Sequence, residues 1–108
     1  MTLGQAQEKF SQDLVKLLAH AFSLGYEVRI GEVQRGMAQQ KYYVKTGRSR
    51  TLDSLHLKKL AADLFFTKDG KLVYPVELGK YWQELDPKNE AGMFWVSFKD
   101  SAHYQKNH

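Results

Sequence analysis

The stretch LAADLFFTKDGKLVY, residues 60–74, carries the clearest structural signal of the chain. It begins with an apolar and aromatic run, Leu60 to Thr67, whose composition is typical of a β-strand. The pair Asp69-Gly70 follows, and this dipeptide favours the tight turn of a two-residue hairpin. Leu72 to Tyr74 is then expected to be the returning strand. The stretch therefore predicts an antiparallel β-hairpin.

Upstream of the hairpin, the hydrophobic pattern predicts a helix and a strand. From Gln5 to Leu24 apolar side chains recur at the i, i+3, i+4 spacing of an amphipathic helix, and Gly25 stands where a C-terminal cap belongs. Tyr26 to Ile30 alternates apolar and charged residues, which indicates a strand half buried against that helix. A second helix is expected over Met37 to Lys45, and the small, polar and basic residues from Thr46 to Ser54 are interpreted as a surface loop.

Downstream of the hairpin, a helix and a further strand are expected. Val76 to Leu85 is predicted to be a short helix between Pro75 and Pro87, and Met93 to Tyr104 an aromatic-rich strand region. Too little chain separates the strands for a set of parallel crossovers. The order of elements predicts an α+β fold with a small, mostly antiparallel sheet flanked by helices.

Composition and charge narrow the class of protein. The chain has 108 residues, of which 43% are hydrophobic and 13% aromatic, so a packed core is expected and a disordered chain is excluded. The lack of cysteine excludes a disulfide framework and thiolate metal sites, so any metal must be held by histidine and carboxylate groups. The formal net charge of +4 favours an anionic partner, which could be nucleic acid, a membrane surface or a cell-wall polymer.

The sequence shows neither a membrane-spanning segment nor the pattern of a signal peptide. No run of about 18 apolar residues could span a bilayer, and the start MTLGQAQEKF lacks the basic-then-apolar order of a signal peptide. We therefore expect synthesis in a cytoplasm and no stable membrane insertion.

One candidate pair for chemistry lies in the stretch 54–63. His56 and Asp63 are seven positions apart, about 10 Å along a helix and more than about 20 Å along a strand. They could share a metal ion only if the chain bends between them, most naturally at residues 57–59. His56 would then lie on a loop and Asp63 on the strand from Leu60 to Phe66.

A second candidate pair lies in the stretch 95–105. Asp100 and His103 are three positions apart, so on a helical turn they would project from the same side. Two histidines and one aspartate would leave the fourth tetrahedral position of zinc open for a water, and Asp100 could then accept a proton. From the residues alone, an ordinary surface or core position for each histidine stays an open alternative.

Taken together, these stretches resemble the VanY-type zinc peptidases, which include D,D-carboxypeptidases, vancomycin-resistance dipeptidases and phage L-alanyl-D-glutamate endolysins. The first family motif is Ser-x-His-x-x-Gly-x-Ala-x-Asp, matched here by Ser54, His56, Ala61 and Asp63. The second is an aromatic-led Asp/Glu-x-x-His, matched by Trp95, Phe98, Asp100, His103, Tyr104 and Gln105. The resemblance extends over about residues 10–105, including the segment from Gly25 to Arg35.

The resemblance implies a Hedgehog/D,D-peptidase-like zinc peptidase fold and a role for each matched position. The implied zinc ligands are His56, Asp63 and His103. Asp100 would be the catalytic base, and Arg35 would hold the substrate or stabilise the oxyanion. Supporting or substrate contacts would come from Ser54, Trp95 and Gln105.

Two positions depart from the family pattern. Lys59 stands where the first motif commonly has glycine, so a positive φ at this turn would be strained. Val96 follows Trp95 where relatives often have glycine, which could narrow the groove beside the metal. Neither residue is an implied ligand, so activity is expected to survive.

The resemblance further implies a zinc metallopeptidase, a peptidoglycan hydrolase of phage or prophage origin that cleaves an amide bond of the stem peptide. The L-alanyl-D-glutamate bond is the first choice. We expect one peptidase domain over residues 1–108 without a separate cell-wall-binding domain, acting as a monomer on the peptidoglycan stem peptide and not on nucleic acid. Without a signal peptide, such an endolysin would accumulate in the host bacterial cytoplasm and reach the periplasmic cell wall after holin-mediated release.

Three alternatives remain at this point. Within the class, the chain could be a D,D-carboxypeptidase or dipeptidase that acts on D-Ala-D-Ala. From a different class, it could be a small basic nucleic-acid-binding module, supported by the charge and the TGRSR loop. A third hypothesis is a metal-free relative that keeps the fold and has lost the activity.

Overall fold

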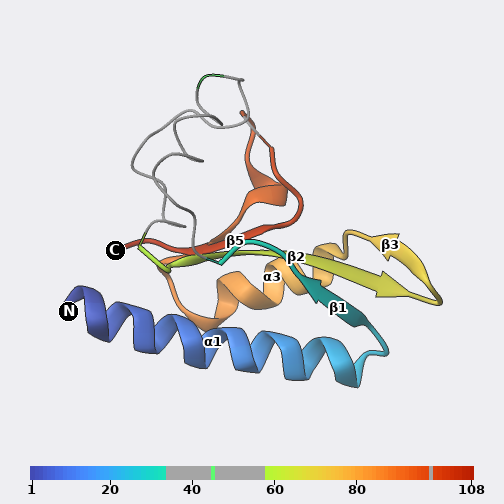
Figure 1. The fold of residues 1–108 in the computed structure, drawn as a ribbon, viewed down its shortest axis with the longest axis horizontal. Helices are drawn as coiled ribbons and strands as arrows, with labels where there is room; N and C mark the ends of the chain where they lie inside the picture. The colour runs from blue at the N-terminus through green and yellow to red at the C-terminus, as the bar shows by residue number, and fades with distance from the viewer. Residues whose placement is uncertain (34–44, 46–57, 98) are drawn as a thin grey trace.

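The computed structural model of the chain describes residues 1–33, 45, 58–97 and 99–108. Its elements, in chain order, are α1 (Leu3–Ser23), β1 (Glu27–Ile30), β2 (Ala61–Lys68), β3 (Lys71–Val73), α3 (Val76–Leu85), β4 (Asn89–Ala91), the short 3-10 helix η1 (Gly92–Phe94) and β5 (His103–Lys106) (Figure 1). The loop predicted from Thr46 to Ser54 and the helix predicted from Met37 to Lys45, apart from Lys45 itself, lie outside the described residues.

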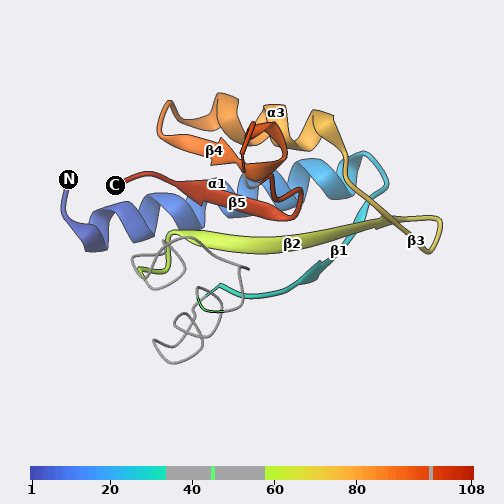
Figure 2. The same ribbon diagram turned by 90° about the horizontal axis from the view of Figure 1, so that it is seen from above.

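The sheet is built around β2. Its strand order is β1-β2-β5-β4, which Figure 2 shows from β1 across to β4, and β3 also pairs with β2. β2 pairs with β1 through residues 64–67, with β5 through residues 61–63 and with β3 through residues 66–68. All of these pairs and the β4–β5 pair are antiparallel, which confirms the predicted α+β fold with an antiparallel sheet.

Helix α1 begins and ends on local sequence signals. Thr2 and Gln5 form a capping box, in which each side chain binds the backbone of the other residue. Gly25 follows the helix with a φ of +88°, a conformation that glycine adopts without steric cost. The predicted helix is therefore confirmed. It buries one stripe of its surface: Ala6, Phe10, Asp13, Leu17 and Ala21.

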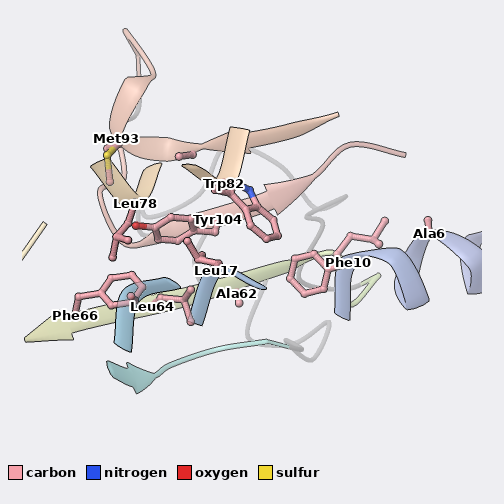
Figure 3. Packing of buried hydrophobic residues seen from close by; sticks show 13 residues of the cluster. Ala6, Phe10, Leu17, Ala62, Leu64, Phe66, Leu78, Trp82, Met93 and Tyr104 are labelled. Carbon is pink, nitrogen blue, oxygen red and sulfur yellow. The ribbon is translucent and has the colours of Figure 1, made fainter. Parts of the chain in front are cut away.

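The core lies between the two helices and one face of the sheet. Alternate residues of β2 point into it, as does Tyr104 of β5, and they meet side chains from both helices (Figure 3). The members shown there include Phe10, Leu17, Ala62, Leu64, Phe66, Leu78, Trp82 and Tyr104. Because side chains alternate along a strand, Asp63 and Phe65 belong to the opposite face of β2. Figure 1 shows α1 along one side of the sheet, so the face of β2 that carries Asp63 is turned away from this helix.

The hairpin predicted first has the expected geometry. β2 and β3 are joined by Asp69 and Gly70, with φ values of +53° and +77°. Two central residues with positive φ define the turn that matches the twist of a β-hairpin. The predicted helix from Val76 to Leu85 is also confirmed, as α3.

The strand region predicted from Met93 to Tyr104 is confirmed only at its end, where His103 and Tyr104 begin β5, and is wrong at Met93 and Phe94, which lie in η1. The chain instead forms β4, which the pattern did not predict, then η1, a reversal, and β5 from His103 to Lys106. Met93 is buried against α3, because Gly79 has no side chain: a Cβ there would lie 2.6 Å from the sulfur of Met93. Met93 therefore packs into the core from η1, whereas the neighbouring Phe94 is exposed. No helix in residues 1–33, 58–97 or 99–108 is long and apolar enough to cross a bilayer.

Candidate metal centre

Asp63 is held in the middle of the sheet by backbone contacts on both sides. On one side it is the register partner of His103 in β5. On the other side, Gly31 N donates to Asp63 O at 2.8 Å and Asp63 N donates to Glu32 O at 2.9 Å, so two successive residues oppose one, as in a β-bulge. Gly31 permits this close approach, since a Cβ there would lie 2.8 Å from the ring of Phe65 and 3.3 Å from the Cβ of Asp63.

His103 lies across from Asp63 with its ring between polar groups. Its Nδ1 is 3.6 Å from Asp63 Oδ1, and its Nε2 is 2.7 Å from Gln105 Oε1. The ring of Trp95 contacts it at a tilt, with 5.1 Å between the two ring centroids. His103 is buried, so its imidazole has little freedom to rotate away from these neighbours.

Asp100 reaches the same place through a tight turn. Its backbone O accepts from His103 N at 3.3 Å, and its Oδ1 accepts from Ala102 N at 3.1 Å. Its own backbone N donates to Gly92 O at 3.1 Å, which ties the turn to η1. The sequence prediction placed Asp100 and His103 on one helical turn. That local structure is wrong, because His103 already belongs to β5, but the turn still brings the two side chains together.

The three side chains form a cluster that could hold a metal ion. One ligand atom from each of Asp63, Asp100 and His103 lies within 4.8 Å of the other two. Ligand atoms at about 2.0–2.2 Å from a tetrahedral zinc are separated by about 3.4 Å. The 3.6 Å between Asp63 and His103 fits that separation without rearrangement. The donor set, one imidazole nitrogen and carboxylate oxygens, suits zinc and other first-row metals.

The expected bend before Asp63 is present. Lys58 and Lys59 form a turn, and Lys59 has a φ of +56°, the left-handed conformation that the glycine of the family motif would adopt more easily. The other predicted site residues before this turn, Arg35, Ser54 and His56, lie outside the part of the chain that the structure describes.

A pocket opens beside the cluster. It has a volume of about 440 Å³, and Asp63 and Asp100 both line it. The other described residues that line it are Phe65, Tyr74, Lys99, Ser101 and Ala102. Among the described residues, two carboxylates, one lysine and two aromatic side chains therefore surround this space.

A row of polar side chains continues from His103 across the same face of the sheet. Gln105 Nε2 donates to Asn107 Oδ1 at 2.8 Å and to Glu90 Oε2 at 3.3 Å, and Asn107 Nδ2 donates to Glu90 Oε2 at 2.6 Å. Glu90 and Asn107 were not among the predicted site residues. Their signal in the sequence is the alternation of His103, Gln105 and Asn107, which marks one polar face of a strand.

A buried ion-pair cluster anchors the other face of β5. Lys106 Nζ lies 2.9 Å from Asp13 Oδ2 and 3.3 Å from Asp86 Oδ2, and it donates to Asn89 Oδ1 at 2.7 Å. Lys9 also bonds to Asp13. Burial alone would raise the pKa of Asp13, but the hydrogen bonds from Lys9, Lys106 and Asn89 outweigh it and lower that pKa. The cluster ties α1 to the strand that carries His103, and the sequence pattern did not predict it.

Comparisons with known proteins support the fold. No family model matches the chain, and neither does any curated protein. Among solved structures, the chain is similar to the crystal structure of Serratia marcescens L-Ala D-Glu endopeptidase ChiX, with a TM-score of 0.70 and 24% sequence identity. The match covers 98% of this chain and 89% of that chain. The two chains therefore share a fold over nearly their whole lengths.

Proposed function

We propose that this chain is a zinc-dependent peptidoglycan hydrolase that cleaves an amide bond of the stem peptide, with the L-alanyl-D-glutamate bond as first choice. The observation that carries the proposal is the convergence of Asp63, Asp100 and His103 on one face of a sheet whose fold is that of an L-Ala D-Glu endopeptidase. The resemblance of the two sequence motifs to zinc peptidases points to the same chemistry. On the strength of that resemblance, we place the activity in phage-driven lysis of a bacterial host.

Each residue has a distinct role in the proposed mechanism. His103 and Asp63, together with His56, would hold a zinc ion, which when bound supplies a Lewis acid that activates water and polarises the scissile carbonyl. Asp100 takes the proton of the attacking water and passes it to the leaving amine as the C–N bond breaks. Arg35 contributes positive charge near the oxyanion.

The surroundings of Asp100 suit a proton carrier. Its side chain is exposed, and the bond from Ala102 N engages one of its two oxygens. The pocket beside it would receive the stem peptide, and Lys99 on the pocket wall offers a cation to a substrate carboxylate.

Metal content and lysis test the proposal together. We expect about one zinc per chain by elemental analysis, and lysis of outer-membrane-permeabilised Gram-negative cells that stops on chelation and returns with zinc. A protein that takes up no zinc and lyses no cells would refute the proposed function. In that case, the next experiment would test the alternative of a nucleic-acid-binding module, by measuring binding to nucleic acid at increasing salt concentration.

The bond that is cleaved is identified by mass spectrometry of digested muropeptides. Cleavage between L-alanine and D-glutamate releases stem peptides that have lost their L-alanine. Release of D-alanine alone would instead assign the chain as a D,D-carboxypeptidase.

The role of Asp100 is tested by Asp100→Asn. The amide still accepts the hydrogen bond from Ala102 N but cannot take up a proton, so we expect zinc to be retained and hydrolysis to fall by about 100-fold or more. Asp69→Asn, the same change at the hairpin tip, is the matched control and should leave hydrolysis unchanged. Undiminished hydrolysis by Asp100→Asn would show that Asp100 is not the base.

A further inference from the structure

The orientation of the Gln105 side chain follows from one neighbour, the carboxylate of Glu90, which can only accept hydrogen bonds. Glu90 is its register partner on β4, so the two side chains stand opposite each other on one face of the sheet. A carboxylate accepts hydrogen bonds and donates none. Both amides that reach Glu90 must therefore turn their NH2 groups toward it: Gln105 at 3.3 Å and Asn107 at 2.6 Å.

The remaining contacts of the two amides follow from this constraint. With its NH2 group on Glu90, Asn107 presents its Oδ1 to Gln105, whose Nε2 donates to it at 2.8 Å. Gln105 then has its Oε1 turned to His103 Nε2, at 2.7 Å. An amide oxygen only accepts, so the proton of a neutral imidazole must lie on Nε2.

The tautomer of His103 decides which of its nitrogens can bind a metal. With the proton on Nε2, the lone pair of the neutral ring is on Nδ1, and that is the nitrogen that faces Asp63. If Gln105 turned by half a rotation, its NH2 group would face Nε2 and favour the other tautomer. That tautomer carries a proton on Nδ1 and cannot bind a metal there.

We propose that Glu90 is a positioning residue of the metal centre: through Gln105 and Asn107 it fixes His103 in the tautomer that presents Nδ1 to a divalent cation. The inference rests on the proposed function for the identity of His103 as a ligand. Its chain of hydrogen bonds crosses β4 and β5, and Trp95 on the ring of His103 restricts rotation about the same contact. Partners that orient ligating histidines are commonly worth 10–100-fold in metal affinity.

The first test measures the tautomer in the metal-free protein. Long-range 1H–15N NMR of the imidazole, recorded where the ring is neutral, distinguishes a proton on Nε2 from one on Nδ1. We expect the Nε2–H form in the natural chain and a mixture in Glu90→Gln, because glutamine can also donate and no longer fixes the amides. Glu84→Gln, the same change at an exposed position of α3, is the matched control.

The second test measures zinc affinity by competition with a chromophoric chelator. We expect binding to weaken about 10-fold or more in Glu90→Gln and to stay unchanged in Glu84→Gln. Gln105→Leu removes the acceptor itself and should give the same tautomer mixture, so it decides the question if Glu90→Gln does not fold.

The outcomes separate this inference from the proposed function. A single Nε2–H tautomer in both Glu90→Gln and Gln105→Leu would overturn the inference, and so would weaker zinc binding without any change of tautomer. A natural chain that binds no zinc and hydrolyses no peptidoglycan would refute the proposed function. The tautomer comparison would then still show whether Glu90 orients His103.

Discussion

Gly92 lies directly against Asp100, because a Cβ atom on Gly92 would overlap the carbonyl oxygen of Asp100 and lie 3.2 Å from the Cβ of His103. This contact packs the turn that contains Asp100 directly against η1, which begins at Gly92. The same turn donates a hydrogen bond from Asp100 N to Gly92 O. The position of the proposed base therefore depends on the absence of one methyl group.

Gly92→Ala is expected to displace this turn. Overpacking of this kind costs typically about 1–3 kcal/mol of the free energy of unfolding, and the displaced Asp100 and His103 should lower zinc affinity as well as hydrolysis. Gly4→Ala is the control, since a Cβ there would meet only Thr2 Oγ1, at 3.9 Å. Thermal unfolding and zinc titration of both variants measure the effects, and unchanged zinc affinity in Gly92→Ala would contradict the prediction.

Lys59→Gly is expected to stabilise the fold. Lys59 has a φ of +56°, and left-handed backbone costs a residue with a Cβ roughly 1–2 kcal/mol that glycine does not bear. Part of this gain is lost to the greater entropy of glycine in the unfolded chain, so we expect a net gain of about 0.5–1 kcal/mol. The neighbouring Lys58→Gly, where φ is not positive, should instead destabilise. Urea unfolding measures both, and equal effects would refute the argument from strain.

Tyr104→Phe is expected to stabilise the protein. The Tyr104 hydroxyl is buried in the apolar core and has no hydrogen-bond partner among the described residues. An unsatisfied buried polar group costs about 1–3 kcal/mol, so its removal should raise the free energy of unfolding by about 1 kcal/mol. Chemical denaturation checks this, and a loss of stability would show that the hydroxyl has a partner.

The same tyrosine should make stability fall at alkaline pH. Burial raises the pKa of Tyr104 above that of the unfolded chain, so its neutral form favours the folded state. This contribution is fully present below the unfolded pKa of about 10 and is lost as the pH rises above it. Tyr104→Phe should therefore lose stability less steeply than the natural chain above about pH 10. Parallel slopes of unfolding free energy against pH would contradict the prediction.

Asp13→Asn is expected to destabilise the protein at neutral pH. The change leaves Lys106 buried with one charged partner fewer, which costs about 3 kcal/mol when a buried pair is broken. The pKa of Asp13 is lowered in the folded state, so its stabilisation is present above the unfolded pKa of about 3.9 and lost as the pH falls through the folded value. Glu8→Gln on the same helix is the control. Unfolding measured at neutral and acidic pH should show the difference between natural chain and Asp13→Asn shrinking in acid.

Several elements could be predicted because their signals are local in the sequence. The apolar spacing of α1 and the glycine after it, the Asp69-Gly70 turn and α3 between its two prolines depend on residues close in the chain, so their pattern predicted them. The bend before Asp63 was expected from motif spacing, and Lys59 with its positive φ lies within it.

The arrangement of the region from Asn89 to Lys106 depends on contacts between distant parts of the chain, so local sequence patterns did not predict it. β4 has only three residues and is stabilised mainly by its pairing with β5. A sequence pattern of three residues is too short to predict such a strand. Glu90 meets Gln105, and Asp13 meets Lys106, across long stretches of chain. Such contacts depend on which strands and helices become neighbours. This is decided when two helices bury one face of the sheet, and not by residues that are close in the sequence. The sequence could therefore name Asp63, Asp100 and His103 as candidates, and the fold brought them together.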